Sequence, residues 1–425
     1  MMIISWADKG VIGLAAQPIM HDLGLSPSEF GLVGSSLFFL FCVTPVGIGL
    51  LANRVSTRWV LVGLVVCWSI AQVPVLLVAA LPTLIGSRVL LGAAEGPTTP
   101  MVVHHIYKWF PHRERALPAG VGTAGAALGL AVAAPGLSAV IVHFGWQAAF
   151  GVLAAAGLIW AAVWVFIGRD GPFTTYRAAM SGSAEGIGDA AEAKADAGAS
   201  GEEARVPYRR IMTSSTWIGA TLGGHLAYWA IAIFAAWLPS YFEKGLGFSP
   251  VATGSLMLAP SLVGFAAMVG GGAVCRMLLA RGVSSRWACG FVESALIIVG
   301  GIALLAVAVV HPGTTTQIAL LAIGFGLPFG ALPLANMSVA EVSPVSQRAA
   351  VMSFSVIGMT IAGLFAPTVA GALIGGGATA LGGYHHMMLL VGALMVVGAA
   401  IAALLIRPLR DARKLGLPDA AEPTS

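Results

Sequence analysis

Long apolar runs recur along almost the whole chain. A membrane helix needs about 20 mostly apolar residues, and twelve stretches of the sequence reach that length. They cover residues 2–22, 29–53, 58–81, 83–107, 115–142 and 145–168, and then 214–242, 250–275, 286–311, 314–342, 347–374 and 384–407. A membrane β-barrel would show short alternating segments instead, and the sequence has none. The pattern predicts an all-α membrane protein with twelve transmembrane helices in two pseudo-symmetric six-helix bundles.

A polar stretch separates the two groups of runs. Residues 169–213 hold 13 of the chain's 40 charged residues (22 Lys and Arg plus 18 Asp and Glu) and are rich in Ala, Gly, Ser and Glu. This composition is typical of a flexible, solvated linker, and the tail after Arg407 is similar. The sequence therefore predicts an N-terminal bundle (1–168), a linker, a C-terminal bundle (214–407) and a tail (408–425).

The overall composition excludes several classes of protein. Apolar residues make up 58% of the chain and charged residues only 9%, against about 25% charged in soluble domains. A soluble enzyme and a nucleic-acid-binding protein are therefore excluded. All four cysteines lie inside apolar runs, so we expect small core residues without a disulfide. No cleavable signal peptide is expected, because the first apolar run carries Asp8 and Lys9 and no basic region precedes it.

The basic residues predict the orientation. If both termini are cytoplasmic, 19 of the 22 Lys and Arg fall in cytoplasmic loops, the linker or the tail. Only Lys244 then lies outside, and Lys9 and Arg88 lie within the membrane. Because basic residues are strongly enriched in cytoplasmic loops, we expect a multi-pass protein of the plasma (inner) membrane with both termini cytoplasmic.

Short landmarks recur in the same order in the two halves. Gly-Leu-Ser-Pro at 24–27 precedes the second run, and Gly-Phe-Ser-Pro at 247–250 precedes the eighth. In each, the serine is expected to cap a helix and the proline to occupy its first turn. Pro-x-x-x-Arg-Ala starts at Pro111 before the fifth run and at Pro344 before the eleventh. Two bundles of one design are typical of secondary transporters, which bind substrate between the halves near mid-membrane.

Arg88 and Glu95 are ionisable residues within the fourth run. Such a group is costly at this depth, by roughly 2.5–3.5 kcal/mol on insertion scales. A spacing of seven residues puts them within about 20° of one helix face and roughly 10 Å apart along the axis, and Gly92 between them is expected to leave that face open. We expect both to point into a central cavity, where Glu95 binds a proton and Arg88 binds an anion or Glu95 itself. The alternative is a structural ion pair that holds helices together.

Asp8 and Lys9 form a second charged pair, in the first run. Adjacent side chains on a helix diverge by about 100°, so both border a cavity only if it is wide. We expect Asp8 to be a second proton carrier and Lys9 an anion-binding group. The alternative is that both lie near the cytoplasmic surface.

Other polar residues have weaker assignments. His225, Tyr228 and Trp229 form a polar-aromatic cluster in the seventh run, which either contacts substrate or only packs. Glu341 ends the tenth run near the cytoplasm and is expected to be a gate or loop contact. The sequence has no phosphate-binding Walker loop, metal cluster or nucleophile–base set, so we expect no cofactor, no bound metal and no enzyme.

Motifs then narrow the class. They are Trp6-Ala7-Asp8-Lys9, Arg88-x-x-x-Gly92-x-x-Glu95-Gly96 and Trp237-Leu238-Pro239-Ser240-Tyr241. Residues 49–58 are similar to the loop G-x-L-A-D-R-x-G-x-R, with Asn53 for the aspartate and Ser56 for the second glycine. With the two-bundle pattern, these motifs resemble the major facilitator superfamily, and within it the anion:cation symporter family of organic-anion permeases.

The resemblance implies roles for particular residues. The acids associated with proton coupling correspond to Asp8 and Glu95, and the base associated with the substrate carboxylate corresponds to Lys9. Phe41 and Val356 fall near positions where sugar-acid members commonly have tyrosine and asparagine, which implies a less hydroxylated carboxylate. The cytoplasmic gating residues are expected to be Asn53, Arg54, Arg58, Arg115, Arg276, Glu341 and Arg348.

We therefore expect proton-coupled uptake of a small organic carboxylate by alternating access. The protein is expected to act as a monomer in the lipid bilayer, without a nucleic-acid partner. Two alternatives stay open, namely proton-driven efflux of amphipathic compounds and a membrane sensor that transports nothing. Uptake into vesicles with an imposed proton gradient separates the first hypothesis from the other two.

Overall fold

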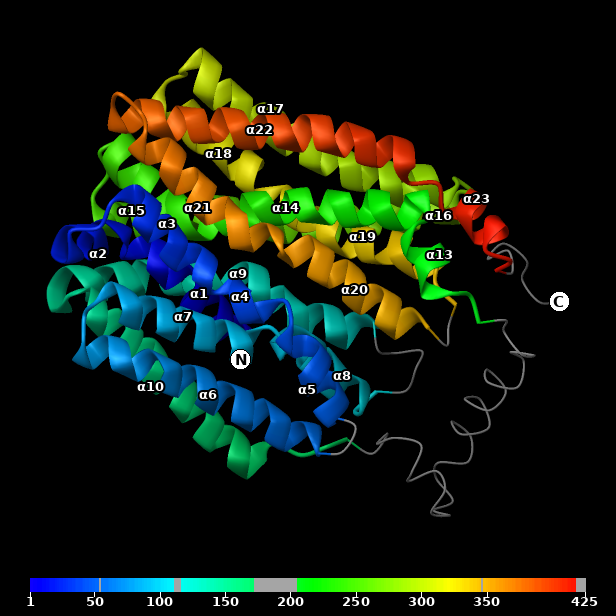
Figure 1. Cartoon of the computed structure of the whole chain (residues 1–425), viewed down its shortest axis with the longest axis horizontal. Coiled ribbons are helices and arrows are strands. Elements are labelled where there is room, and N and C mark those ends of the chain that lie inside the picture. Colours follow the sequence, from blue (N-terminus) through cyan, green and yellow to red (C-terminus); the bar gives the residue numbers. More distant parts are fainter. Residues whose placement is uncertain (53–54, 111–115, 172–204, 345–346, 418–425) are drawn as a thin grey trace.

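The computed structural model describes residues 1–52, 55–110, 116–171, 205–344 and 347–417 (Figure 1). Within these ranges the regular secondary structure is helical throughout, and no strand occurs. The helices cover each of the twelve stretches that hydropathy predicts. The prediction of an all-α protein is therefore confirmed for the part of the chain that the structure describes.

The N-terminal half is built from ten helices, several of which are pieces of one membrane-length stretch. Their bounds are α1 (Met2–Leu14), α2 (Ala16–Leu23), α3 (Pro27–Ser36), α4 (Phe38–Phe41), α5 (Thr44–Ala52), α6 (Thr57–Leu77), α7 (Leu81–Glu95), α8 (Thr98–Tyr107), α9 (Ala116–Phe144) and α10 (Trp146–Ile167). The second and fourth stretches each break near their middle, at Leu37 and at Gly96. Discontinuous helices of this kind commonly line transporter sites.

The C-terminal half repeats this organisation. Its helices are α13 (Tyr208–Met212), α14 (Ser215–Ser240), α15 (Pro250–Leu256), α16 (Leu258–Ala280), α17 (Val292–Val310), α18 (Thr314–Gly326), α19 (Pro328–Glu341), α20 (Arg348–Thr360), α21 (Ala362–Gly375), α22 (Ala380–Leu405) and α23 (Pro408–Lys414). Two π-helical turns, η3 (Tyr241–Gly245) and η4 (Arg286–Phe291), extend α14 and precede α17. In Figure 1 this half occupies the upper part of the molecule and the N-terminal half the lower part.

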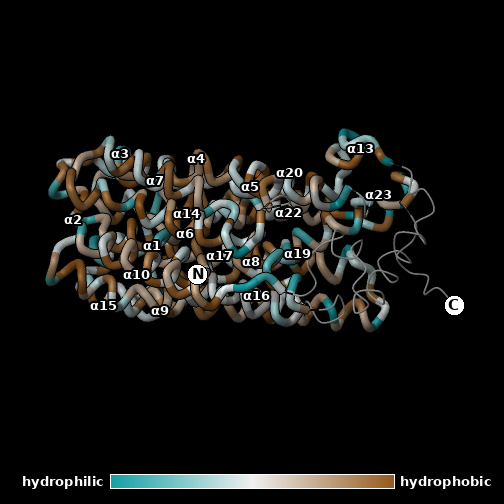
Figure 2. Tube along the Cα trace, turned by 90° about the horizontal axis from the view of Figure 1, so that it is seen from below, coloured by the Kyte–Doolittle hydropathy of each residue, from teal (hydrophilic) through white to brown (hydrophobic). Residues whose placement is uncertain are grey.

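Membrane character follows from length and hydropathy. Nine helical stretches of the described residues are long and apolar enough to cross a bilayer, and Gly129–Phe144 is apolar but shorter. The other two stretches, 2–23 and 81–107, are interrupted and carry the charges expected within the membrane. Brown, apolar residues predominate along the bundle in Figure 2, and teal segments are seen around α13 and α23 as well as near α2 and α8. The chain is therefore a multi-pass membrane protein.

The repeated landmarks cap equivalent helices, as predicted. The Ser26 side chain accepts a hydrogen bond from the backbone N–H of Glu29 at 3.3 Å, and Pro27 is the first residue of α3. In the second half Ser249 accepts from the N–H of Ala252 at 3.3 Å, and α15 begins at Pro250. Each cap satisfies a backbone donor that the helix itself cannot.

The two halves pack closely against each other at the end of the molecule that carries α2 and α15. We call the end that carries α5, α8, α13 and α23 the linker end (right in Figure 1) and the end with α2 and α15 the far end. The extensive contacts across the halves are α3 with α21, α1 with α14, and α9 with α15 and α16. A Cβ on Gly31 would lie 2.5 Å from the carbonyl oxygen of Pro367, so glycine is needed where α3 meets α21. By contrast, α5 and α8 pack on α6 and α9 of their own half.

Three expectations, two outside the bundles and one inside the C-terminal bundle, need correction. The last part of the predicted linker is ordered on the C-terminal half, because the Val206 backbone exchanges hydrogen bonds of 3.0 and 2.9 Å with the Gln347 side chain. The tail forms α23, which packs on α14 and α19. Cys275 and Cys289, expected to be unpaired, form a disulfide between α16 and η4 with Cα atoms 5.2 Å apart.

Candidate functional site

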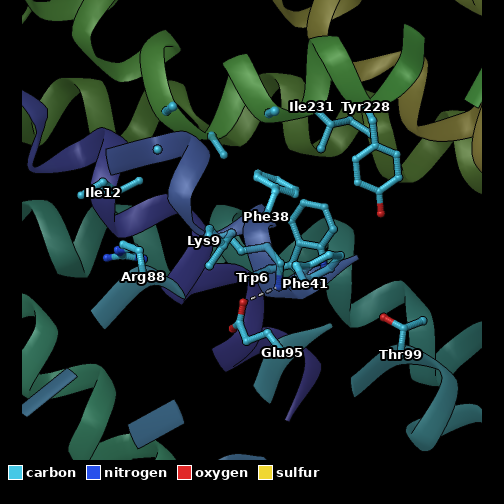
Figure 3. A pocket seen from close by; sticks show the side chains of 15 residues that line it. Trp6, Lys9, Ile12, Phe38, Phe41, Arg88, Glu95, Thr99, Tyr228 and Ile231 are labelled. Carbon is cyan, nitrogen blue, oxygen red and sulfur yellow. Dashed lines mark hydrogen bonds and ion pairs between the residues drawn. The ribbon is translucent and has the colours of Figure 1, made fainter. Parts of the chain in front are cut away.

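A cavity of about 60 Å³ lies between the halves. Helices α1, α3, α4, α7 and α8 of the N-terminal half contribute to its lining, and α14 contributes from the C-terminal half. Figure 3 shows its labelled side chains, with Lys9 near the centre, Glu95 below it and Tyr228 across from them. The lining residues are Trp6, Lys9, Ile12, Gly34, Leu37, Phe38, Phe41, Arg88, Glu95, Thr99, Tyr228, Ile231, Ala232, Ala235 and Ala236.

Lys9 and Glu95 form an ion pair in this cavity. The Lys9 Nζ lies 2.7 Å from the Glu95 Oε2, and their side chains are 11% and 0% exposed. Lys9 also donates to the Ser5 hydroxyl at 2.8 Å, whereas the Glu95 Oε1 is buried without a hydrogen-bond partner among the described residues. One carboxylate oxygen is thus neutralised by a cation, and the other is left unpaired.

Only one of the three guanidinium nitrogens of Arg88 has a hydrogen-bond acceptor among the described residues. Its Nη1 donates to the backbone carbonyl of Asp8 at 2.8 Å, and the guanidinium carbon lies 4.8 Å from the centre of the Phe150 ring. Nε and Nη2 are buried and have no acceptor within the described ranges. These two nitrogens form the edge of arginine that binds a carboxylate through two parallel hydrogen bonds. The free edge is therefore suited to an anion.

Asp8 lies behind the cavity and does not line it. It is fully buried, and its Oδ1 accepts a hydrogen bond from the Gln72 amide on α6 at 3.0 Å. Its Oδ2 has no partner in the part of the chain that the structure describes. Arg88 connects Asp8 to the cavity, because it contacts the Asp8 carbonyl and is itself a lining residue.

The helix breaks place the charged residues. Glu95 is the last residue of α7, directly before the break at Gly96, and α4 lies across from that break. Gly92 does not leave an open face, as the sequence suggested, because a Cβ there would overlap the carbonyl oxygen of Leu37. The close approach of α4 therefore fills the space beside Gly92 and brings Phe38 and Phe41 to the cavity.

Only one residue of the predicted polar-aromatic cluster on α14 lines the cavity. Tyr228 lines the cavity, but His225 and Trp229 do not. The His225 Nδ1 lies 2.9 Å from the Gly358 carbonyl oxygen, and the Trp229 indole donates to the His225 Nε2 at 3.2 Å. His225 therefore contacts α20, Trp229 contacts His225 on its own helix, and neither side chain belongs to the cavity lining.

Four of the seven predicted gating residues fall within the described residues. Asn53, Arg54 and Arg115 fall outside the described residues. Arg58 donates to the Val165 carbonyl, Arg348 donates to the Ser343 carbonyl at 3.4 Å, Glu341 is half-buried at the end of α19, and Arg276 is exposed on α16. In these contacts Arg58 and Arg348 each bind backbone of their own half.

Asp170, which the sequence analysis did not single out, is the acid at the linker end of the N-terminal half. Its side chain accepts from the Ser56 hydroxyl and lies 3.6 Å from the His105 Nδ1 and 3.9 Å from the Lys108 Nζ. It also accepts from the backbone N–H of Arg58 at 3.3 Å. Asp170 thus bonds with the start of α6 and lies close to the end of α8.

Two residues of the site were missed in the sequence. Gln72 is a polar side chain inside an apolar run, which was a usable signal for a buried partner. Phe38 was not recognisable, because only the close approach of α4 to α7 brings it to the cavity. Glu293 is fully buried on α17 beside Gly223, away from the cavity lining.

Two interrupted bundles around a charged central cavity are the architecture of a membrane transporter. Residues 1–367 match the Major Facilitator Superfamily, and the chain belongs to that family. The expected superfamily and fold class are thereby confirmed. Since the relatives below carry the names of transporters, the expectation that the chain is not an enzyme is also supported.

Among its relatives, the hexuronate transporter of Bacillus subtilis is 26% identical over 272 residues, which are 64% of this chain and 61% of that protein. A probable sulfoacetate transporter of Cupriavidus necator is 27% identical over 295 residues, 69% of this chain and 66% of that one. The matched part thus spans less than two thirds of either relative. Among solved structures, a bacterial homologue of the human lysosomal transporter Spinster, inward-facing and occupied, has a TM-score of 0.76 at 16% identity, with 96% of both chains covered.

Proposed function

We propose that the protein takes up an organic carboxylate together with a proton by alternating access. The observation that carries the proposal is that Arg88, whose Nε and Nη2 have no acceptor among the described residues, lines the same cavity as the Lys9–Glu95 ion pair. An anion site and a titratable acid thereby share one cation-rich space between the halves. The relatives that carry the names of anion transporters support this reading.

The proposed coupling is a competition for Lys9. A substrate carboxylate binds the free edge of Arg88 and draws the ammonium of Lys9 away from Glu95. Once Glu95 has lost its cation, its ionised form is costly in a buried site, and the carboxyl takes up a proton. Asp8 is the second proton site of the proposal, since Arg88 contacts its backbone carbonyl and its Oδ2 is unpaired among the described residues.

The test uses the purified full chain in proteoliposomes. A proton gradient directed into the vesicles, in the same direction as substrate uptake, should drive accumulation of a carboxylate. Glu95→Gln should abolish the gradient-driven accumulation but leave counterflow exchange of the same anion, because glutamine keeps the shape and cannot carry the proton. Uptake by the wild type that ignores the gradient would refute the coupling, and intact coupled uptake in Glu95→Gln would make Glu95 structural.

The setting of this activity is part of the proposal. We place the linker end in the cytoplasm of a plasma (inner) membrane because the basic loops cluster there, and we propose a monomer as the working unit. The same vesicles give the direction of transport, since efflux of an amphipathic compound driven by protons would need the opposite response to the gradient.

A further inference from the structure

The cavity is poor in groups that can recognise hydroxyls. Nine of its fifteen lining residues are apolar: Ile12, Gly34, Leu37, Phe38, Phe41, Ile231, Ala232, Ala235 and Ala236. On the C-terminal side, Tyr228 is the lining residue with a polar group. Val356, in contrast to Phe41, is absent from this lining.

Part of the remaining polar groups is already engaged within the protein. Lys9 donates to Glu95 and to the Ser5 hydroxyl, so the Glu95 Oε1, Arg88, Thr99 and Tyr228 are left for a ligand, which are fewer groups than the hydroxyls of a sugar acid need. A sugar acid carries a hydroxyl on nearly every carbon, and each hydroxyl left unpaired in a buried site costs about 1–3 kcal/mol. The cavity therefore disfavours a polyhydroxylated body.

Aromatic rings surround the cationic centre. The Lys9 Nζ lies 5.5 Å from the centre of the Trp6 ring and 5.4 Å from that of Phe41. Phe38 lies against Phe41, with ring centres 5.6 Å apart, and Tyr228 faces them from α14 (Figure 3). Such a group of rings offers stacked and edge-to-face contacts to a flat apolar ligand.

The charges of the site indicate how many carboxylates the ligand carries. Two acids, Asp8 and Glu95, and two bases, Lys9 and Arg88, sum to zero. Glu95 lines the cavity and Asp8 does not, so a single proton on Glu95 offsets the single negative charge of a monocarboxylate, whereas a dianion would need a second proton on the more distant Asp8. The cavity, at about 60 Å³, is also smaller than the ~150 Å³ cavity that admits benzene in another protein, so a compact ligand must already widen it.

We propose that this cavity binds a compact aromatic monocarboxylate with few or no hydroxyls. The carboxylate lies on the free edge of Arg88 and near Lys9, and the ring lies among Trp6, Phe38 and Phe41. The proposal rests on the function proposed above and narrows it to one substrate class, which differs from the hexuronates named for one relative.

Equilibrium binding by the full chain in nanodiscs tests the substrate class with benzoate, cyclohexanecarboxylate and glucuronate. We expect benzoate to bind at least about tenfold more tightly than glucuronate, because glucuronate leaves hydroxyls unpaired. Glucuronate binding as tight as benzoate, followed by proton-driven uptake of glucuronate, overturns the aromatic substrate class and leaves the proposed function standing. Failure of all carboxylates to bind or move overturns both.

A pair of variants on α4 tests the ring contact. Phe41→Ala should weaken benzoate binding by about two- to twelvefold, since an aromatic pair contributes about 0.5–1.5 kcal/mol, and should weaken glucuronate binding less. Phe39→Ala is the matched control, because Phe39 is on the same helix, 56% exposed and outside the cavity. Equal losses for benzoate and glucuronate in Phe41→Ala would contradict a ring contact and indicate a general disturbance.

Discussion

The positive charge of Lys9 interacts with hydrogen-bonding groups and with aromatic rings. The Glu95 carboxylate and the Ser5 hydroxyl bind its ammonium, and two aromatic rings flank it. With exposures of 11% and 0%, the two charged side chains are almost out of contact with water. Removal of one charged partner should therefore destabilise the fold strongly, because the other charge stays buried and unpaired. Removal of both charges should destabilise it much less.

We predict a strong coupling between substitutions at these two positions. Lys9→Met leaves Glu95 buried without a cation, which costs about 3–5 kcal/mol when a buried pair is broken, and should lower the apparent Tm. The double variant Lys9→Met/Glu95→Gln removes both charges and should recover most of that loss. Thermal unfolding of the four proteins in one detergent measures the cycle.

Carboxylate uptake provides the second readout of the same cycle. The double variant should stay inactive despite its recovered apparent Tm, since it lacks both the anion-binding base and the proton carrier. Additive losses of stability in the two single variants would argue against a direct pair, and restored uptake in the double variant would argue against both roles.

At the scale of elements, α23 is joined to the start of α14. The Asp411 Oδ2 accepts hydrogen bonds of 2.8 Å from the Thr216 backbone N–H, the Thr216 hydroxyl and the Ser215 hydroxyl. Arg410 donates to its Oδ1 at 2.8 Å. Although burial alone would raise it, these hydrogen bonds hold the pKa of Asp411 below its usual value. The carboxylate therefore acts as a cap supplied from outside the helix.

Asp411→Asn keeps an acceptor oxygen but removes the negative charge at the start of α14, and it should lower the apparent Tm at pH 7 because such a charge stabilises a helix N-terminus by about 0.3–1 kcal/mol. A carboxyl whose folded pKa is depressed stabilises the fold above its unfolded pKa, and this contribution is lost as the pH falls through the folded pKa. The gap between wild type and variant should thus narrow below about pH 4. Thermal scans from pH 7 to pH 3 measure it, with Lys414→Gln on the same helix as control. A gap that is constant over this range would show that the carboxylate charge is not involved.

The sequence allowed the elements to be predicted better than their contacts. Hydropathy and the serine–proline landmarks are local, so the twelve stretches and the caps at Ser26 and Ser249 could be read directly. Arg88 and Glu95 also lie on one cavity, as helical periodicity suggested. The pairing of Lys9 with Glu95 depends on how α1 packs beside the break in α7, which no spacing along the chain reveals.

Three differences between expectation and structure have the same cause, namely packing between elements. Gly92 was expected to border open space, but a neighbouring backbone occupies it. The Cys275–Cys289 disulfide joins residues 14 apart across a turn, and their approach is set by the packing of η4 on α16. His225 likewise shares a face with Trp229, as expected, yet that face meets α20.

For the whole molecule, the described contacts indicate closure at the far end. The Ser35 hydroxyl on α3 accepts hydrogen bonds from the backbone N–H of Thr368 at 3.2 Å and from its hydroxyl at 2.8 Å. The Gln17 amide on α2 donates to the Ser240 hydroxyl on α14 at 2.5 Å. Alternating access requires these contacts between the halves to separate in each cycle.

A cross-link at this interface should stop transport. We predict that Ser35→Cys/Thr368→Cys forms a disulfide on mild oxidation, because the two side-chain oxygens lie 2.8 Å apart in the native protein. Oxidised protein should lose nearly all uptake, and a reducing agent should restore it. Each single cysteine variant, oxidised in the same way, is the control. Full uptake by a completely cross-linked protein would show that α3 and α21 need not separate.

The equal number of acids and bases around the cavity has an electrical consequence. The empty carrier, with Asp8, Lys9, Arg88 and Glu95 all ionised, would return across the bilayer without moving net charge. A carrier loaded with a monoanion and one proton would also be neutral. Neither the loaded nor the empty carrier would then move net charge across the transmembrane potential. Such a carrier would respond to the pH difference across the membrane and remain insensitive to its voltage.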